Sequence, residues 1–254
     1  MTEKKYYRIA SLEKGIKIFE LLAQNGELSV TEAAKLMDTN RAGSHRFIST
    51  LKDLGYVEKN NNNKYQPTLK IMKLAMKVAN RFEIRRIARP YMHRLSMMFK
   101  ETVNLGFFKN NEIVHIDKID SLEVLRMDSA LGDIAPAYCT GLGKAILAFL
   151  PDHEINHYLE NVSFESKAPN TIVTQDELLS ELERIRQNRY AIDDEEMTVG
   201  LRCIAAPIFD HNSYPKYALS ISGPSMRLTH RMIEDIKPLI LEASNELSRM
   251  MGTP

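Results

Sequence analysis

Residues 29–65 read SVTEAAKLMDTNRAGSHRFISTLKDLGYVEKNNNNKY, and this stretch decides the fold of the N-terminal part of the chain. Ser29 is followed three residues later by Glu32, a capping-box spacing that predicts a helix from Val30. Residues 38–40, Asp-Thr-Asn, hydrogen-bond readily to nearby backbone, so they predict a tight turn and the cap of a second helix. The stretch therefore predicts two helices joined by a short turn.

The second predicted helix has two unlike sides. Apolar side chains recur at helical spacing and form one side together with Ser44; they are Phe47, Ile48, Leu51 and Leu54. We expect this side to pack into the core. The opposite side is polar and cationic, and it consists of Arg41, Ala42, His45, Arg46, Ser49 and Lys52.

A hairpin is predicted after this helix. Gly55 is a typical helix stop, residues 56–58 and 64–66 resemble two short strands, and residues 60–63 are asparagines that tolerate the backbone of a tight tip. Helix, turn, helix and hairpin in this order predict a winged helix-turn-helix. The alternative is a helix pair with a solvated charged face, which this order of elements disfavours.

In a winged helix-turn-helix, the second helix enters the major groove of DNA. There Arg can donate to guanine N7 and O6, while hairpin cations meet phosphate. We therefore predict DNA contacts from the six residues of the polar side and from Lys59 and Lys64 of the hairpin.

Charge separates the two parts of the chain. Residues 1–100 carry 20 Lys and Arg against 9 Asp and Glu, a balance of +11, whereas residues 101–254 carry 14 against 24, a balance of −10. The basic part attracts a polyanion and the acidic part is repelled from it. Two cysteines, no long apolar run and no signal-peptide pattern lead us to expect a cytoplasmic protein with no membrane segment.

Helices flank the predicted DNA-binding element. Residues 11–24 predict a scaffold helix, with Ser11 as its cap. Residues 69–100 predict two basic helices that meet near residues 80–83, and Pro90 should break or kink the second. The first of these helices has an apolar stripe, which favours a buried core or a dimer interface; it consists of Leu69, Met72, Ala75, Met76 and Ala79. A dimer interface is expected, because the two DNA-binding units of a dimer must be held one turn of DNA apart.

Strands dominate the pattern after residue 100. Residues 103–108, 113–119, 124–128, 203–209 and 217–222 have strand composition, and predicted helices lie between them. Strand hairpins mixed with helices predict an α+β sensor-like domain. We expect residues 1–80 to form the DNA-binding domain with the start of a linker helix, and residues 81–254 to form an effector-binding and oligomerisation domain.

Several long motifs match a known family. They are GLRCIAAPIFD at residues 200–210, LSISGP at 219–224, DDEE at 193–196 and PAYCTGLGKA at 136–145. Over nearly its whole length the chain resembles the IclR family of bacterial transcription regulators. The resemblance implies an N-terminal winged helix, a C-terminal GAF-like effector domain, and homodimers or homotetramers on palindromic double-stranded DNA operators.

The resemblance also implies a pocket for a small carboxylate. Its residues carry over onto Met127, Ala135, Gly141, Leu142, Asp193, Cys203, Ser220 and Ser222. Alternate serines on a strand face one side, and a free N–H at Gly141 suits an anion. From the residues alone, we favour the interpretation in which Cys203 is a small buried residue and the two serines are ordinary strand residues.

Residues 118–121 and 125–129 look most like those of regulators of 2-keto-3-deoxygluconate and pectin or hexuronate catabolism. We therefore expect a repressor controlled by a sugar acid such as 2-keto-3-deoxygluconate. The alternatives are an activator, or a response to glyoxylate, pyruvate or an aromatic acid.

His153, Glu154 and His157 match the H-E-x-x-H pattern of zinc proteases, in which two imidazoles bind the metal and Glu activates water. The helix is short, follows Pro151 and has no evident third ligand, so a metal-dependent hydrolase is a remote alternative. We predict no catalytic residue, no metal and no cofactor.

Overall fold

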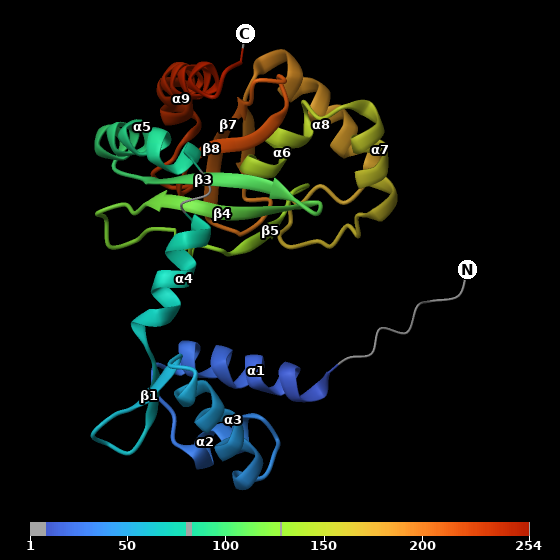
Figure 1. Cartoon of the computed structure of the whole chain (residues 1–254). Coiled ribbons are helices and arrows are strands. Elements are labelled where there is room, and N and C mark those ends of the chain that lie inside the picture. The colour runs from blue at the N-terminus through green and yellow to red at the C-terminus, as the bar shows by residue number, and fades with distance from the viewer. Residues whose placement is uncertain (1–8, 80–82, 128, 254) are drawn as a thin grey trace. The chain divides into compact units, whose positions relative to one another are not determined.

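The computed structural model describes residues 9–79, 83–127 and 129–253, and the chain divides into two compact units, Met1–Arg81 and Phe82–Pro254 (Figure 1). The first unit contains four helices and a two-stranded hairpin within its described residues. They are α1 (Ala10–Asn25), α2 (Val30–Leu36), α3 (Arg41–Asp53), β1 (Val57–Lys59), β2 (Tyr65–Pro67) and α4 (Leu69–Ala79).

Local capping fixes the helix-turn-helix. Ser29 and Glu32 form the predicted capping box: the Ser29 N–H donates to the Glu32 carboxylate at 2.7 Å, and the Glu32 N–H donates to the Ser29 hydroxyl at 3.2 Å. Asn40 caps α3 by accepting the Gly43 N–H at 2.7 Å. Fully buried Ile48 then packs α3 against α1.

The hairpin and the first helix differ slightly from prediction. Both strands begin one residue later than expected, because Tyr56 is still bonded to the end of α3. The predicted Ser11 cap is wrong: α1 begins at Ala10, after an Ile9 that makes no side-chain cap bond. Gly26, at φ 74°, ends α1.

The second unit is built on one antiparallel six-stranded sheet of order β5-β4-β3-β8-β7-β6. Its strands are β3 (Thr102–Lys109), β4 (Glu112–Ile119), β5 (Ile134–Pro136), β6 (Ala191–Asp194), β7 (Leu201–Phe209) and β8 (Pro215–Pro224). Its helices are α5 (Glu83–Phe99), α6 (Gly141–Leu147), α7 (Asp152–Asn161), α8 (Gln175–Asn188) and α9 (His230–Met250).

Helices cover both faces of this sheet. Helices α5 and α9 pack side by side on one face, over a core that includes Leu105, Ile204 and Leu219 (Figure 1). Helix α6 lies on the other face, where α8 packs against it. The predicted α+β class with a winged helix-turn-helix is confirmed.

Two elements depart from prediction in this unit. Helix α5 continues through Pro90, because buried Met92 and Leu95 extend the apolar face begun by Ile84 and outweigh the lost hydrogen bond. Residues 124–127 of the predicted third strand are not in a strand. The edge strand is instead β5, which pairs with β4.

Candidate functional site

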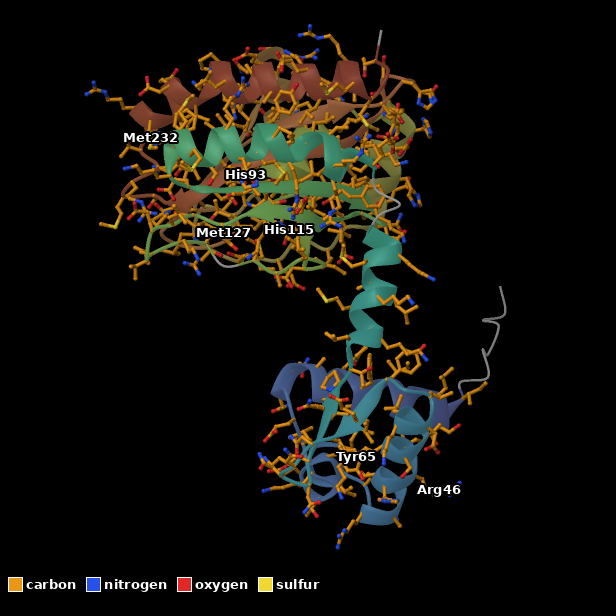
Figure 2. All side chains as sticks on the ribbon, turned by 60° about the vertical axis from the view of Figure 1, so that its left-hand side comes forward. Arg46, Tyr65, His93, His115, Met127 and Met232 are labelled. Carbon is orange, nitrogen blue, oxygen red and sulfur yellow. The ribbon has the colours of Figure 1, made fainter. Side chains whose placement is uncertain are left out.

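Helix α3 presents the predicted polar side to solvent. Ser44 and Ile48 are fully buried on its inner side. On the outer side Ser49 is half-buried and the others are exposed, namely Arg41, Ala42, His45, Arg46 and Lys52. Figure 2 labels Arg46 on this helix. Within α3 the one acidic residue is Asp53, at the C-terminal end of the helix. The outer side is therefore cationic.

The two wing lysines have different surroundings. Lys59 is exposed, with its ammonium 5.9 Å from the centre of the Tyr65 ring. Lys64 is half-buried and forms ion pairs with Glu27 at 3.6 Å and Glu32 at 3.4 Å. The charge of Lys64 is therefore partly compensated within the protein, whereas that of Lys59 faces solvent.

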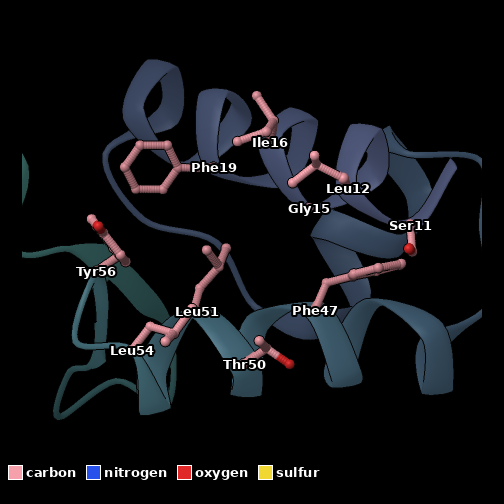
Figure 3. Close-up of a pocket in the computed structure, with 10 residues that line it drawn as sticks. All are labelled: Ser11, Leu12, Gly15, Ile16, Phe19, Phe47, Thr50, Leu51, Leu54 and Tyr56. Atoms are coloured by element: carbon pink, nitrogen blue, oxygen red, sulfur yellow. The ribbon is translucent and has the colours of Figure 1, made fainter. Parts of the chain in front are cut away.

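An apolar groove of about 610 Å³ lies between α1 and α3 on the same unit (Figure 3). Leu12, Ile16 and Phe19 of α1 face Phe47 and the leucines of α3 across it. The groove contains no charged side chain, so it offers an apolar contact surface rather than a site for chemistry.

The second unit holds a cavity of about 250 Å³ between the sheet and the start of α6. All eight residues predicted for the effector pocket line it: Met127, Ala135, Gly141, Leu142, Asp193, Cys203, Ser220 and Ser222. They come from separated parts of the chain, and the fold brings them together.

Strand register explains this convergence. On neighbouring strands, Ser222 pairs with Cys203, and Cys203 pairs with Asp193, so their side chains lie in a row on one face of the sheet. A Cβ on Gly141 would lie 3.0 Å from the Cys203 sulfur. The glycine therefore lets α6 begin directly above the row.

A polar network surrounds the serines. Fully buried Asn104 of β3 donates from Nδ2 to the Ser222 hydroxyl at 3.3 Å, and its Oδ1 accepts from Ser129 at 3.2 Å. The Ser220 hydroxyl is also buried and has no hydrogen-bond partner among the described residues. Such an unpaired group in a cavity wall is available to a ligand.

Asp193 is the electrostatic centre of the cavity. Its Oδ1 accepts the backbone N–H groups of Glu196 at 2.8 Å and Met197 at 3.3 Å. Burial and the neighbouring Glu196 carboxylate raise the pKa of Asp193 to about 7. Behind it, the fully buried Lys144 is paired with Glu196, and with Glu181 at 3.4 Å. Near neutral pH, Asp193 can hold or release a proton.

Among the described residues, the cavity lining contains no Lys or Arg. A bound carboxylate would therefore be received by hydroxyl and N–H donors and by a protonated Asp193.

The two cysteine thiols of the chain are poor nucleophiles, because burial raises the pKa of both Cys139 and Cys203 to about 12.

Sequence reasoning missed other lining residues. They are His115, Ser129, Asp133, Ile134, Thr140, Met197, Thr198 and Leu201. Only His115 carried a signal, as a lone imidazole within a strand of mostly apolar residues. His115 and Met127 are both marked in Figure 2.

The geometry gives the zinc-protease interpretation no support. His153 and His157 are exposed on α7, and the Glu154 carboxylate accepts a hydrogen bond from the Tyr214 hydroxyl at 2.7 Å. In the described part of the chain, no three His, Cys, Asp or Glu side chains are grouped as a metal site requires.

Comparison with known proteins identifies the family. The family model "IclR helix-turn-helix domain" matches residues 11–61, and "Bacterial transcriptional regulator IclR C-terminal" matches residues 76–249. The chain belongs to the IclR family. It is therefore a DNA-binding transcription regulator, and no described helix is long and apolar enough to cross a membrane.

Individual IclR proteins align over almost the whole chain. The regulator KdgR of Escherichia coli is 34% identical over 96% of this chain and 93% of its own. The crystal structure of Thermotoga maritima IclR is 35% identical, with a TM-score of 0.89 over 96% of this chain and all of that one. An IclR homologue of Microbacterium hydrocarbonoxydans, solved with 4-hydroxybenzoate, shares the fold at 17% identity and a TM-score of 0.80, covering 95% of this chain and 98% of that one.

Proposed function

We propose that this IclR-family protein is a repressor whose affinity for its operator is controlled by a small hydroxylated acid such as 2-keto-3-deoxygluconate. One observation carries the proposal: the eight predicted pocket residues line a single cavity, whose described walls set hydroxyl and carboxyl groups among apolar side chains and contain no Lys or Arg. Hydroxyls of Ser220 and Ser222 suit a ligand rich in hydroxyls. The KdgR relative and the homologue that holds 4-hydroxybenzoate support a small organic acid.

Control of DNA binding requires differential affinity. An effector changes operator affinity only if it binds the DNA-bound and free arrangements unequally, a coupling of about 1–3 kcal/mol in typical cases. We propose that the outer face of α3 contacts the operator and that the effector weakens this contact.

We propose a homo-oligomer on a palindromic operator. The apolar stripe of α4 supports this arrangement, because Leu69, Met72 and Met76 are 80%, 61% and 47% exposed within one chain. The groove between α1 and α3 adds a second apolar surface on the same unit. Light scattering that returns a monomer, both free and on operator DNA, would contradict this assembly.

The test of the effector is thermal stabilisation against a panel of small acids, combined with release of operator DNA. The panel contains 2-keto-3-deoxygluconate, pyruvate, glyoxylate and 4-hydroxybenzoate. A ligand at a hundred times its dissociation constant stabilises the native state by about 2.7 kcal/mol, which is readily seen. Stabilisation by none of these acids would refute the effector class.

A variant of the cavity tests whether the acid binds there. Ser222→Leu should fill the cavity and abolish both stabilisation and DNA release, while operator binding persists. Ser180→Leu, on the exposed face of α8, is the matched control and should respond as the wild type does. A normal response of the Ser222 variant would show that the acid binds elsewhere.

A further inference from the structure

We propose that His115 is a specificity-determining residue of the cavity, and that it hydrogen-bonds a hydroxyl on the end of the effector remote from its carboxylate. The inference rests on the proposed effector class and names the part of the ligand that His115 reads. Of the predicted pocket residues, Cys203, Ser220 and Ser222 come from the strands next to Asp193, whereas His115 comes from β4, on the other side of β3.

The imidazole of His115 is built into the wall with a nitrogen left open. The residue is 7% exposed, and its Nδ1 has no hydrogen-bond partner among the described residues. Its backbone is fully engaged outside the regular ladder: its N–H donates to the Asp133 carbonyl at 2.9 Å, and its carbonyl accepts from Gly132 at 2.8 Å. The backbone of His115 is therefore held in place, and an unpaired buried nitrogen is costly unless a ligand or water meets it.

The surroundings of His115 select a neutral hydroxyl over a carboxylate. Burial lowers the pKa of His115, so the ring is neutral near pH 7. Two charges act on the ring: the Asp133 carboxylate lines the same cavity and would repel an anion there, whereas Lys118 is not among the described residues that line the cavity. A hydroxyl can donate or accept, and it satisfies Nδ1 in either tautomer of the neutral ring.

A second open group lies within the same cavity. The buried Ser220 hydroxyl, on β8, also has no partner in the described part of the chain. Strand β3 separates β4 from β8; its Gly106 lies opposite His115, and its Asn104 lies opposite Ser220. A ligand with hydroxyls along its chain can meet both groups, whereas an unsubstituted acid leaves both unpaired.

A bulge in β4 places His115 and Asp117 on opposite faces of the sheet. The β3–β4 register shifts by one residue, with Gly106 opposite His115 and Leu105 opposite Asp117, so Ile116 is an extra residue. Because of this bulge, His115 lines the cavity while Asp117 faces α5, where it accepts from Arg89 at 2.9 Å and pairs with Arg85 at 3.5 Å. These two ion pairs hold β4 against α5 and keep the imidazole in place.

The test compares two acids of equal chain length on the full-length protein. Calorimetry measures dissociation constants for 2-keto-3-deoxygluconate and for 2-oxohexanoate, which has the same carboxylate and keto groups but no hydroxyls. Wild type should prefer the hydroxylated acid. His115→Ala should weaken it by about tenfold, the size of one hydrogen bond, and leave 2-oxohexanoate unchanged.

A conservative variant separates recognition from folding. His115→Gln keeps a hydrogen-bonding side chain and should recover part of the preference, while unchanged binding of 2-oxohexanoate reports an intact cavity in each case. His157→Ala, an exposed histidine on α7, should behave as wild type.

Equal weakening of both acids by His115→Ala, or no change in either, would overturn the assignment of His115 and leave the proposed effector class standing. Failure of the wild type to bind either acid would overturn both.

Discussion

The outer face of α3 and the cavity of the C-terminal unit both recognise other molecules in this proposal, yet they are built in opposite ways. The α3 face is open, cationic and drawn from one helix of 13 residues. The cavity is recessed between the sheet and α6, has no Lys or Arg in its described walls, and is formed by residues of five strands and of the loops and helix beside them. A surface that meets a polyanion needs only charge and periodicity, whereas a cavity that selects one small molecule needs strands held in register.

The largest effect on stability should follow from a substitution that removes the packing of α3 against α1. Ile48 is fully buried between α3 and α1, so Ile48→Ala should lower the free energy of unfolding of the N-terminal unit by about 2–5 kcal/mol. Chemical denaturation followed by circular dichroism would measure the loss. Ile48→Ala should lower operator affinity and leave effector affinity unchanged. A fall in both affinities would show that the α3 face and the cavity do not fold independently.

Base reading by α3 should give the next largest effect. Arg46→Ala should cost about 1–3 kcal/mol of operator affinity and relax preference at one base pair, if the guanidinium contacts a base edge. Fluorescence anisotropy on operators substituted at single positions would show this. Arg231→Ala, exposed on α9, is the control. A loss equal on every sequence would assign Arg46 to phosphate instead.

The cavity should respond to pH in a way the helix does not. Since Asp193 has a pKa of about 7, it is mostly protonated below that pH and ionised above it. An anionic effector binds better beside the protonated form, so affinity should fall above pH 7, by up to tenfold per pH unit. Calorimetry between pH 6 and 8 would test the trend, and Asp193→Asn should flatten it. A flat profile in the wild type would place the ligand carboxylate away from Asp193.

The smallest effect should distinguish the two wing lysines. Lys59→Ala should reduce the salt dependence of DNA binding by about one counterion, since its charge faces solvent. Lys64→Ala should reduce it less, because Glu27 and Glu32 already compensate that charge. Binding isotherms at several salt concentrations would rank the two. An equal reduction would show that Lys64 leaves its ion pairs on DNA.

Local signals predicted the helix-turn-helix well. The Ser29 and Glu32 capping box, the Asn40 cap and the buried face of α3 depend on residues within one or two turns of each other, so spacing alone reveals them. Of the break or kink predicted at Pro90, the break is wrong, because buried residues on both sides of the proline keep α5 continuous.

The cavity was predicted through family resemblance, and the residues alone left it open. Nothing local places Ser222 beside Cys203 and Cys203 beside Asp193, because strand pairing joins positions far apart in the chain. His115 was missed for the same reason. Regular alternation would put residues 115 and 117 on one face, and only the non-local pairing of β4 with β3 reveals the extra residue between them.

That extra residue has an evolutionary consequence. His115 and Asp117 are two positions apart, yet one lines the cavity and the other pairs with Arg85 and Arg89. If His115 contacts the effector as proposed, point changes at residue 115 would alter which metabolite a descendant binds, while the attachment of β4 to α5 stays as it was. A deletion of Ile116 would make His115 and Asp117 neighbours in a regular strand, which again places their side chains on opposite faces, so we expect lineages to vary residue 115 with or without the bulge while they keep Asp117.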